Sequence, residues 1–156
     1  MSQSYEEIVL GESFLRLPLD ARHEAICARL HDQVARCVAN LPSTRLLPPR
    51  SVVQIATGTL LRPDLALVAA ATGKIWLAAE IIAARDHRVD TVTKKTFYEE
   101  VNLPRLWMVD PRYDNVEVYH ASEYGMALKG ILAAREVLTE PLLPTFQIAI
   151  QDLFAG

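Results

Sequence analysis

The sequence predicts a mixed α/β domain, in which helices pack against a sheet of both parallel and antiparallel strands. Short apolar runs of strand length recur along the chain, and the run 75–82 is rich in Trp, Leu and Ile. Two segments with helical periodicity stand between these runs. The 156 residues, 51% hydrophobic and 22% charged, suit one domain with a sizeable core. We therefore expect residues 1–156 to form a single domain.

The first half of the chain predicts one long helix and three strands. Residues 1–19 form a polar lead-in that packs as a short arm. A helix then begins at Asp20, a good N-cap, and ends before Pro42. Its apolar face is expected to hold Ile26, Leu30, Val34, Cys37, Val38 and Leu41. Strands follow at 51–56, 61–69 and 75–82, and their short connections predict antiparallel neighbours.

The second half predicts a helix crossover followed by further strands. Asp90 caps a helix that runs from residue 91 to about residue 102 and leads into the apolar run 106–110. A helix that joins two strands of one sheet predicts a parallel pair with a right-handed connection. Strands are also expected at 116–119, 136–140 and 146–150, since each is a short apolar run.

Composition narrows the classes of function. No apolar run approaches the length of a membrane span, and the acidic N-terminus lacks a signal-peptide core, so we expect a cytoplasmic protein. Cys27 and Cys37 lie about 15 Å apart if they share a helix, too far for a disulfide. The net charge of −3 gives no generally basic surface for nucleic acid. The basic residues of the middle third could form a local patch, although charge alone favours their solvating loops and helix faces: Arg45, Arg50, Arg62, Lys74, Arg85, Arg88, Lys94 and Lys95.

Two carboxylates stand where buried strands call for apolar side chains. Asp64 follows Arg62 and Pro63, and Glu80 lies between Ala79 and Ile81. A buried carboxylate is costly unless it is paired or coordinates a metal. Two of them on adjacent strands could hold Mg²⁺ or Mn²⁺, with a strand carbonyl and waters completing the shell. The alternative is that Asp64 caps a strand and Glu80 pairs with an arginine, and the residues alone leave both open.

Three polar residues share one face of the second helix. Asp90, Lys94 and Tyr98 lie at positions i, i+4 and i+8. If this face packs on the sheet, it points toward Glu80. A lysine there could orient an attacking water or stabilise charge that develops on a phosphate. The alternative is an exposed Asp90–Lys94 ion pair.

The first helix carries a histidine stripe that resembles a metal site. His23, Cys27 and His31 recur every four residues, but no fourth ligand is evident and Cys27 fits the apolar face. A structural zinc site needs four ligands, so we do not expect zinc here.

These residues resemble the Uma-type endonuclease family of the PD-(D/E)XK restriction-endonuclease-like superfamily. The resemblance is carried by Arg62-Pro63-Asp64 and by the spacing from Glu80 through Asp90 and Lys94 to Tyr98. Further similarity lies at residues 22–23, 106–111 and 143–154, so the resemblance covers nearly the whole chain.

The resemblance implies a restriction-endonuclease-like fold and metal-dependent hydrolysis of phosphodiester bonds in DNA. It implies that Asp64 and Glu80 hold Mg²⁺ (or Mn²⁺) and that Lys94 assists the attacking water. It also implies supporting residues that orient this set: Asp90, Tyr98, His23 and Glu24. A twofold partner would let such a domain address both strands, so a homodimer is expected.

Two departures from the family pattern define the alternatives. The superfamily's lysine two residues after the glutamate is Ile82 here, and the small polar residue after it is Ala83. Lys94 would have to reach the same place from the helix. One alternative is therefore a catalytically inactive nuclease-fold protein that acts as a DNA-binding or regulatory module. Another is a purely structural dimer, in which the polar set is exposed or paired off.

Overall fold

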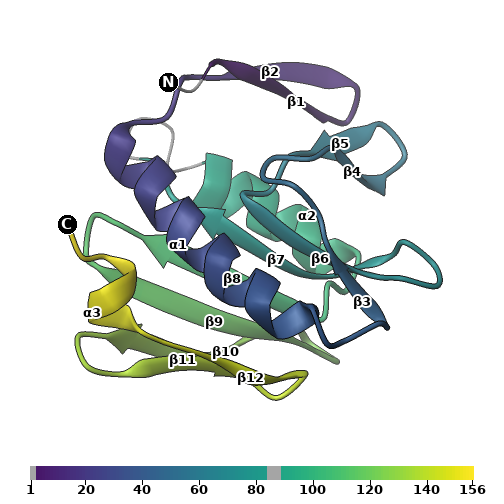
Figure 1. The fold of residues 1–156 in the computed structure, drawn as a ribbon. Coiled ribbons are helices and arrows are strands. Elements are labelled where there is room, and N and C mark those ends of the chain that lie inside the picture. Colours follow the sequence, from purple (N-terminus) through teal and green to yellow (C-terminus); the bar gives the residue numbers. More distant parts are fainter. Residues whose placement is uncertain (1–2, 84–88) are drawn as a thin grey trace.

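The computed structural model describes residues 3–83 and 89–156, which form three sheets and a small number of helices (Figure 1). The strands are β1 (Tyr5–Val9), β2 (Glu12–Arg16), β3 (Thr44–Leu46), β4 (Val53–Ala56), β5 (Thr59–Leu61), β6 (Leu65–Ala69), β7 (Ile75–Ile81), β8 (Arg105–Asp110), β9 (Asn115–Ser122), β10 (Gly125–Ala133), β11 (Val137–Glu140) and β12 (Leu143–Ala149). The helices are α1 (Ala21–Val38), the π-helical turn η1 (Val89–Lys94), α2 (Lys95–Glu100) and α3 (Ile150–Leu153).

A six-stranded mixed sheet forms the centre of the molecule, with strand order β10-β9-β8-β7-β6-β3. The β7–β8 pair is parallel, and the other pairs are antiparallel. Helix α1 crosses one face of this sheet and α2 lies on the other (Figure 1). The predicted α/β class and the parallel crossover are therefore confirmed.

Side chains alternate between these two faces along β7. Leu77, Ala79 and Ile81 pack into the core beneath α1, together with β12. Ala78 and Ile82 pack against α2, and the strand alternation places Glu80 on their side. The acidic residue in the strand therefore faces the helix that follows it.

Helix α1 follows its sequence pattern closely. The carboxylate of Asp20 accepts a hydrogen bond from the backbone N–H of His23 at 2.7 Å, as expected of an N-cap. Ile26, Leu30 and Val34 are fully buried. Both cysteines are free, and no helix in the described part of the chain is long and apolar enough to cross a membrane.

A second sheet, with strand order β2-β1-β5-β4, corrects several predictions. The expected lead-in arm is the hairpin β1–β2. The expected strand 61–69 is interrupted at Pro63, which lies between β5 and β6. The expected strands 61–69 and 75–82 pair in the central sheet through β6 and β7. The expected strand 51–56 corresponds to β4, which pairs with β5 in the second sheet. Strand β10 was not predicted, because Gly130 interrupts its pattern; the pairing with β9 shifts register between Leu128 and Gly130.

Candidate active site

Glu80 lies at the centre of the polar site, and its two carboxylate oxygens have different partners. Oε1 accepts a hydrogen bond from Lys94 Nζ at 2.7 Å, and Oε2 accepts one from the Tyr98 hydroxyl at 2.6 Å. Glu80 and Lys94 are each 1% exposed. The helix face predicted from i, i+4 and i+8 spacing therefore does point toward Glu80, and the alternative of an exposed Asp90–Lys94 pair is wrong.

Asp90 lies one turn before Lys94, but its main partner is on the N-terminal hairpin. Arg16 Nη2 donates to both Asp90 oxygens at 3.0 and 3.1 Å, and the backbone N–H of Ala83 donates to Oδ2 at 3.2 Å. The Lys94 ammonium is 4.0 Å from Asp90 Oδ1. Asp90 thus joins the hairpin to the end of β7 and to the turn that carries Lys94.

Glu7, on β1, is a member of the site that the sequence did not reveal. Its Oε2 lies 2.8 Å from Lys94 Nζ and accepts a hydrogen bond from the backbone N–H of Arg62 at 2.7 Å. Its Oε1 accepts a hydrogen bond from Arg16 Nη1. The available signal was the two-residue alternation that puts Glu7 on the same side of β1 as buried Val9. Five charged residues are thus buried in contact, and we call them the charge cluster: Glu7, Arg16, Glu80, Asp90 and Lys94.

Asp64 immediately precedes β6 and lies beside Ile81, the residue that follows Glu80. Its Oδ2 accepts a hydrogen bond from the backbone N–H of Ile81 at 2.8 Å, and its Oδ1 accepts one from Arg50 Nη1 at 3.1 Å. Arg50 also pairs with Glu24, whose Oε1 is 2.9 Å from Nη2. Arg50 therefore connects Asp64 to one of the two α1 residues that were expected near the site.

His23 is the other α1 residue expected there. Its Nε2 is 2.9 Å from the carbonyl oxygen of Ile81 and 3.7 Å from Asp64 Oδ2. A hydrogen bond to the carbonyl makes Nε2 the protonated nitrogen, since a carbonyl can only accept. Its buried Nδ1 has no hydrogen-bond partner in the described part of the chain. The structure thus brings both His23 and Glu24 to the Asp64 side of the site.

Burial and charge act in opposite directions within the charge cluster. Burial lowers the pKa of Lys94, but Glu80, Glu7 and Asp90 outweigh it and hold that pKa well above its usual range. Burial raises the pKa of Glu80, and Lys94 opposes this rise. Burial acts to raise the pKa of Glu7 as well, but Lys94 and the Arg62 N–H keep it below its ordinary value. Lys94 is therefore a cation at neutral pH.

Asp64 and Glu80 form a donor set that suits a hard divalent ion. Each oxygen of the two carboxylates accepts one of the hydrogen bonds described above, and a carboxylate has about four acceptor sites in all. No three His, Cys, Asp or Glu side chains within residues 3–83 and 89–156 gather to hold a metal by themselves. Mg²⁺ commonly uses only one or two carboxylates and keeps several waters. Two carboxylates with acceptor sites left are the kind of donor set that such an ion uses.

A pocket of about 490 Å³ opens beside this site, where α1 begins and β8 ends. His23, Ile82 and Ala83 line it, together with two arginines. Arg22 pairs with Asp114, and Arg112 donates to both oxygens of Asp110 at 3.0 and 2.9 Å. The two guanidinium groups in its wall are thus neutralised by carboxylates.

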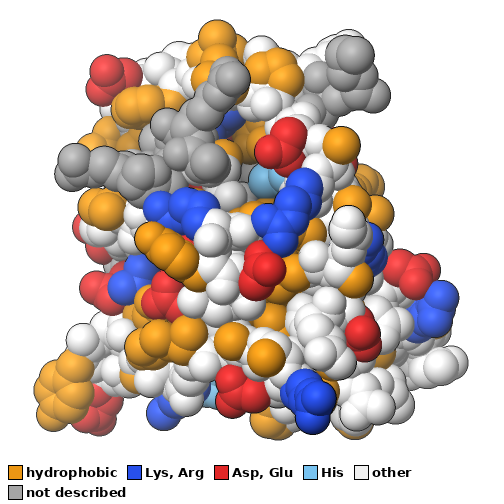
Figure 2. Space-filling view, turned by 90° about the vertical axis from the view of Figure 1, so that its left-hand side faces the viewer, with side chains coloured by type: hydrophobic (Ala, Val, Ile, Leu, Met, Phe, Trp, Pro, Cys, Tyr) orange, Lys and Arg blue, Asp and Glu red, His pale blue; other side chains and the backbone are white. Residues whose placement is uncertain are grey.

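The surface around this pocket is mixed in charge. On the side where α1 begins, Lys and Arg side chains lie beside Asp and Glu side chains (Figure 2). Of the basic residues considered for a patch, Lys94 is buried and Arg50 is ion-paired. Arg85 and Arg88 lie outside the described residues. The described surface beside the pocket therefore carries both signs of charge.

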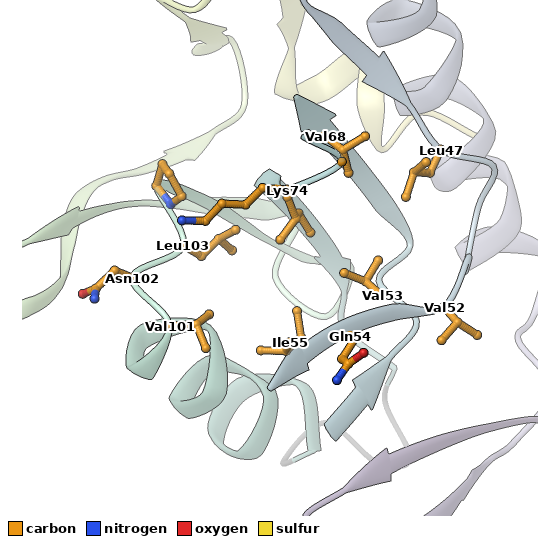
Figure 3. A pocket seen from close by; sticks show the side chains of 13 residues that line it. Leu47, Val52, Val53, Gln54, Ile55, Val68, Lys74, Val101, Asn102 and Leu103 are labelled. Atoms are coloured by element: carbon orange, nitrogen blue, oxygen red, sulfur yellow. The ribbon is translucent and has the colours of Figure 1, made fainter. Parts of the chain in front are cut away.

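A second pocket, of about 320 Å³, lies away from these residues. Val53 and Ile55 of β4 and Val101 after α2 point into it, and Lys74 crosses one side (Figure 3). None of its lining residues belongs to the predicted site. We therefore assign it no part in the chemistry.

Comparison with known proteins shows the family. Residues 2–151 match the model of the Uma2 family, described as a putative restriction endonuclease. The chain belongs to the Uma2 family. A search of curated proteins gave no match. The predicted family is thereby confirmed.

A solved structure shares the fold. It is a putative nuclease belonging to DUF820 from Anabaena variabilis ATCC 29413. The two chains are 14% identical, with a TM-score of 0.79, and the match covers 96% of this chain and 89% of the other. At this identity the likeness shows the nuclease-like fold, and the roles of individual residues rest on their geometry.

Proposed function

We propose that this Uma2 protein is a metal-dependent endonuclease that hydrolyses phosphodiester bonds in DNA. The family gives the nuclease class. The observation that carries the proposal is the buried contact between Glu80 and Lys94, at 2.7 Å. Glu80 lies on β7, which pairs with β6, the strand that Asp64 precedes. A lysine and two carboxylates placed together match the groups that phosphodiester hydrolysis requires, namely metal ligands and a cation for developing negative charge.

Each residue has a distinct part in this proposal. Asp64 and Glu80 would hold Mg²⁺ or Mn²⁺, which when bound polarises a phosphate oxygen and lowers the pKa of a bound water. Lys94 remains protonated, so it would orient the attacking water by donating a hydrogen bond and would not act as a base. Tyr98 and Asp90 would keep Glu80 and Lys94 in place, and His23 would hold the Ile81 carbonyl.

We also propose that two copies act together as a cytoplasmic homodimer, because one centre cuts one strand of a duplex at a time. A dimer would convert supercoiled plasmid directly into linear DNA, whereas independent monomers would first accumulate nicked circles.

Cleavage of supercoiled plasmid in Mg²⁺ or Mn²⁺ tests the proposal. Wild type should cut, while Glu80→Gln and Lys94→Met should each lose about 100-fold or more in rate, since each removes a group that acts on the transition state. Glu140→Gln is the matched control, because Glu140 is also a buried carboxylate but pairs with Arg105 outside the site. Full activity in the Glu80 and Lys94 variants, with folding intact, would contradict the assignment.

A second function is favoured by specific contacts. Lys94 already neutralises Glu80, and Arg50 already neutralises Asp64, so protein cations satisfy both proposed ligands. A nuclease fold arranged in this way could bind DNA as a regulatory module without cutting it. Salt-sensitive DNA binding by wild type, with no cleavage in either metal, would select this function.

A further inference from the structure

The geometry points to Glu7 and Arg16, on the hairpin β1–β2, as positioning residues that hold Lys94 in place for the reaction. This inference rests on the proposed function and deepens it. It gives the N-terminal hairpin, which belongs to a different sheet from Glu80, a direct part in the site.

Glu7 connects the two halves of the site. Its Oε2 lies 2.8 Å from Lys94 Nζ and accepts a hydrogen bond from the backbone N–H of Arg62 at 2.7 Å. Arg62 stands two residues before Asp64, so one carboxylate oxygen fixes both the ammonium group and the segment that leads into Asp64. A shift of Glu7 would therefore change the distance between Lys94 and Asp64.

Arg16 fixes Glu7 from the second strand of the hairpin. Its guanidinium donates to Glu7 Oε1 through one terminal nitrogen and to both Asp90 oxygens through the other. A planar guanidinium holds two carboxylates in a defined relative geometry, which the flexible ammonium of a lysine does not. Because Asp90 lies one turn before Lys94, Arg16 orients the turn as well as the carboxylate.

The lysine side chain needs such support because it is long and flexible. Four charged groups face its ammonium: Glu7 from β1, Arg16 from β2, Glu80 from β7 and Asp90 from η1. If Glu80 turns an oxygen toward a metal ion, its hydrogen bond to Lys94 weakens. The 2.8 Å contact with Glu7 would then hold the ammonium, which has three N–H donors and could direct another at the attacking water.

Stability alone is a poor reason for this arrangement. Burying charged groups carries a large desolvation cost, and apolar side chains of similar volume often stabilise a protein as well or better. A hairpin held to the domain by apolar contacts would fold at lower cost. The concentration of these charges on Lys94 therefore favours a role in the site.

Two variants test the inference against a matched control. Glu7→Gln keeps an oxygen to accept the Arg62 N–H but removes the negative charge that faces the Lys94 ammonium. Arg16→Lys keeps the positive charge but loses the planar fork. Glu140→Gln again serves as the control, since it places the same substitution at a carboxylate that is 2% exposed and paired with Arg105.

Two readouts are needed, and one of them does not depend on activity. We expect Glu7→Gln and Arg16→Lys to lower kcat for plasmid cleavage by about 10- to 100-fold with KM little changed, as for residues that orient a reacting group. We also expect an amine-reactive reagent, followed by peptide mass spectrometry, to label Lys94 faster in Glu7→Gln than in wild type or Glu140→Gln. The labelling is done at one pH and without DNA.

The outcomes separate this inference from the proposed function. Wild-type kcat and unchanged Lys94 labelling in folded Glu7→Gln would overturn the positioning role. If Glu7→Gln does not fold, the same two results in Arg16→Lys would overturn it. Faster Lys94 labelling together with an inactive wild type would support the contact between Glu7 and Lys94 while rejecting the nuclease.

Discussion

The two faces of the central sheet are built from the same strands but are held in different ways. The face beneath α1 is apolar apart from the polar contacts around Asp64, and its core includes Trp107 and Phe146, whose ring centroids lie 5.3 Å apart. The opposite face combines apolar residues such as Leu106 and Met108 with the charge cluster. Alternation along β7 and β8 is sufficient to make both faces.

The difference lies in what each face requires of its partners. Apolar contacts are non-directional, so the α1 face needs side chains of roughly the right volume. The buried charges need specific partners at hydrogen-bond distance, because an unpaired buried charge costs several kcal/mol. The α1 face therefore stabilises the domain, while the opposite face sets the positions of a few polar atoms.

The largest expected effect on stability comes from the apolar face. Phe146→Ala should lower the free energy of unfolding by about 3–5 kcal/mol, because it leaves a cavity against Trp107. Urea unfolding followed by Trp fluorescence measures this loss. Cleavage per folded molecule should stay close to wild type, and a large loss of kcat in the folded fraction would show that the two faces are not independent.

A smaller, pH-dependent effect is expected from the charge cluster. The pKa of Glu7 is below its ordinary value of 4.5, so ionised Glu7 stabilises the fold above about pH 4.5 and this contribution is lost as the pH falls. Glu7→Gln should cost about 1.5–3 kcal/mol near pH 7, the range for a hydrogen bond to a charged group. The difference from wild type should shrink steadily below pH 4.5.

Unfolding of wild type and Glu7→Gln across pH 3 to 7 measures this difference. A constant gap across the whole range would mean that the carboxylate contributes through packing and not through its charge. That result would remove the contrast between the two faces.

The smallest effect is expected for an ion pair that lies on neither face. Arg36 and Asp32 form an i, i+4 pair at 2.9 Å on α1, with side chains 72% and 60% exposed. Arg36→Ala should change stability by at most about 0.5 kcal/mol, because water screens the pair. A loss of stability as large as that of Glu7→Gln would show that burial does not decide how much an ion pair contributes to the free energy of unfolding.

Much of the site was predictable because it depends on local periodicity. The spacing of Asp90, Lys94 and Tyr98 predicted that they share one helix face. Glu80, an acidic residue within an apolar strand, was the residue that this face was expected to approach. The structure joins them through the contacts of Lys94 and Tyr98 with Glu80. The π-helical turn that replaces the first part of the expected helix did not remove this face.

The hairpin was not predictable in the same way. Glu7 and Arg16 lie in a polar stretch whose sequence predicts a short arm. Their partners, Lys94 and Asp90, are far away along the chain. The Arg16–Asp90 contact spans 74 positions. The hairpin pairs with β5, and this pairing brings these residues to Lys94. The local sequence pattern does not predict that pairing.

The sequence by itself determined the family, the α/β class, the Asp20 cap of α1 and the polar face of Lys94. The cap and the face depend on residues close together in the chain, and the class and the family depend on the order of short patterns along it. Only the tertiary structure decided which carboxylates meet Lys94 and that Arg50 pairs with Asp64. The physical reason is that side-chain direction follows from the short repeats of helix and strand. Contacts between distant segments follow from how whole sheets pair and pack.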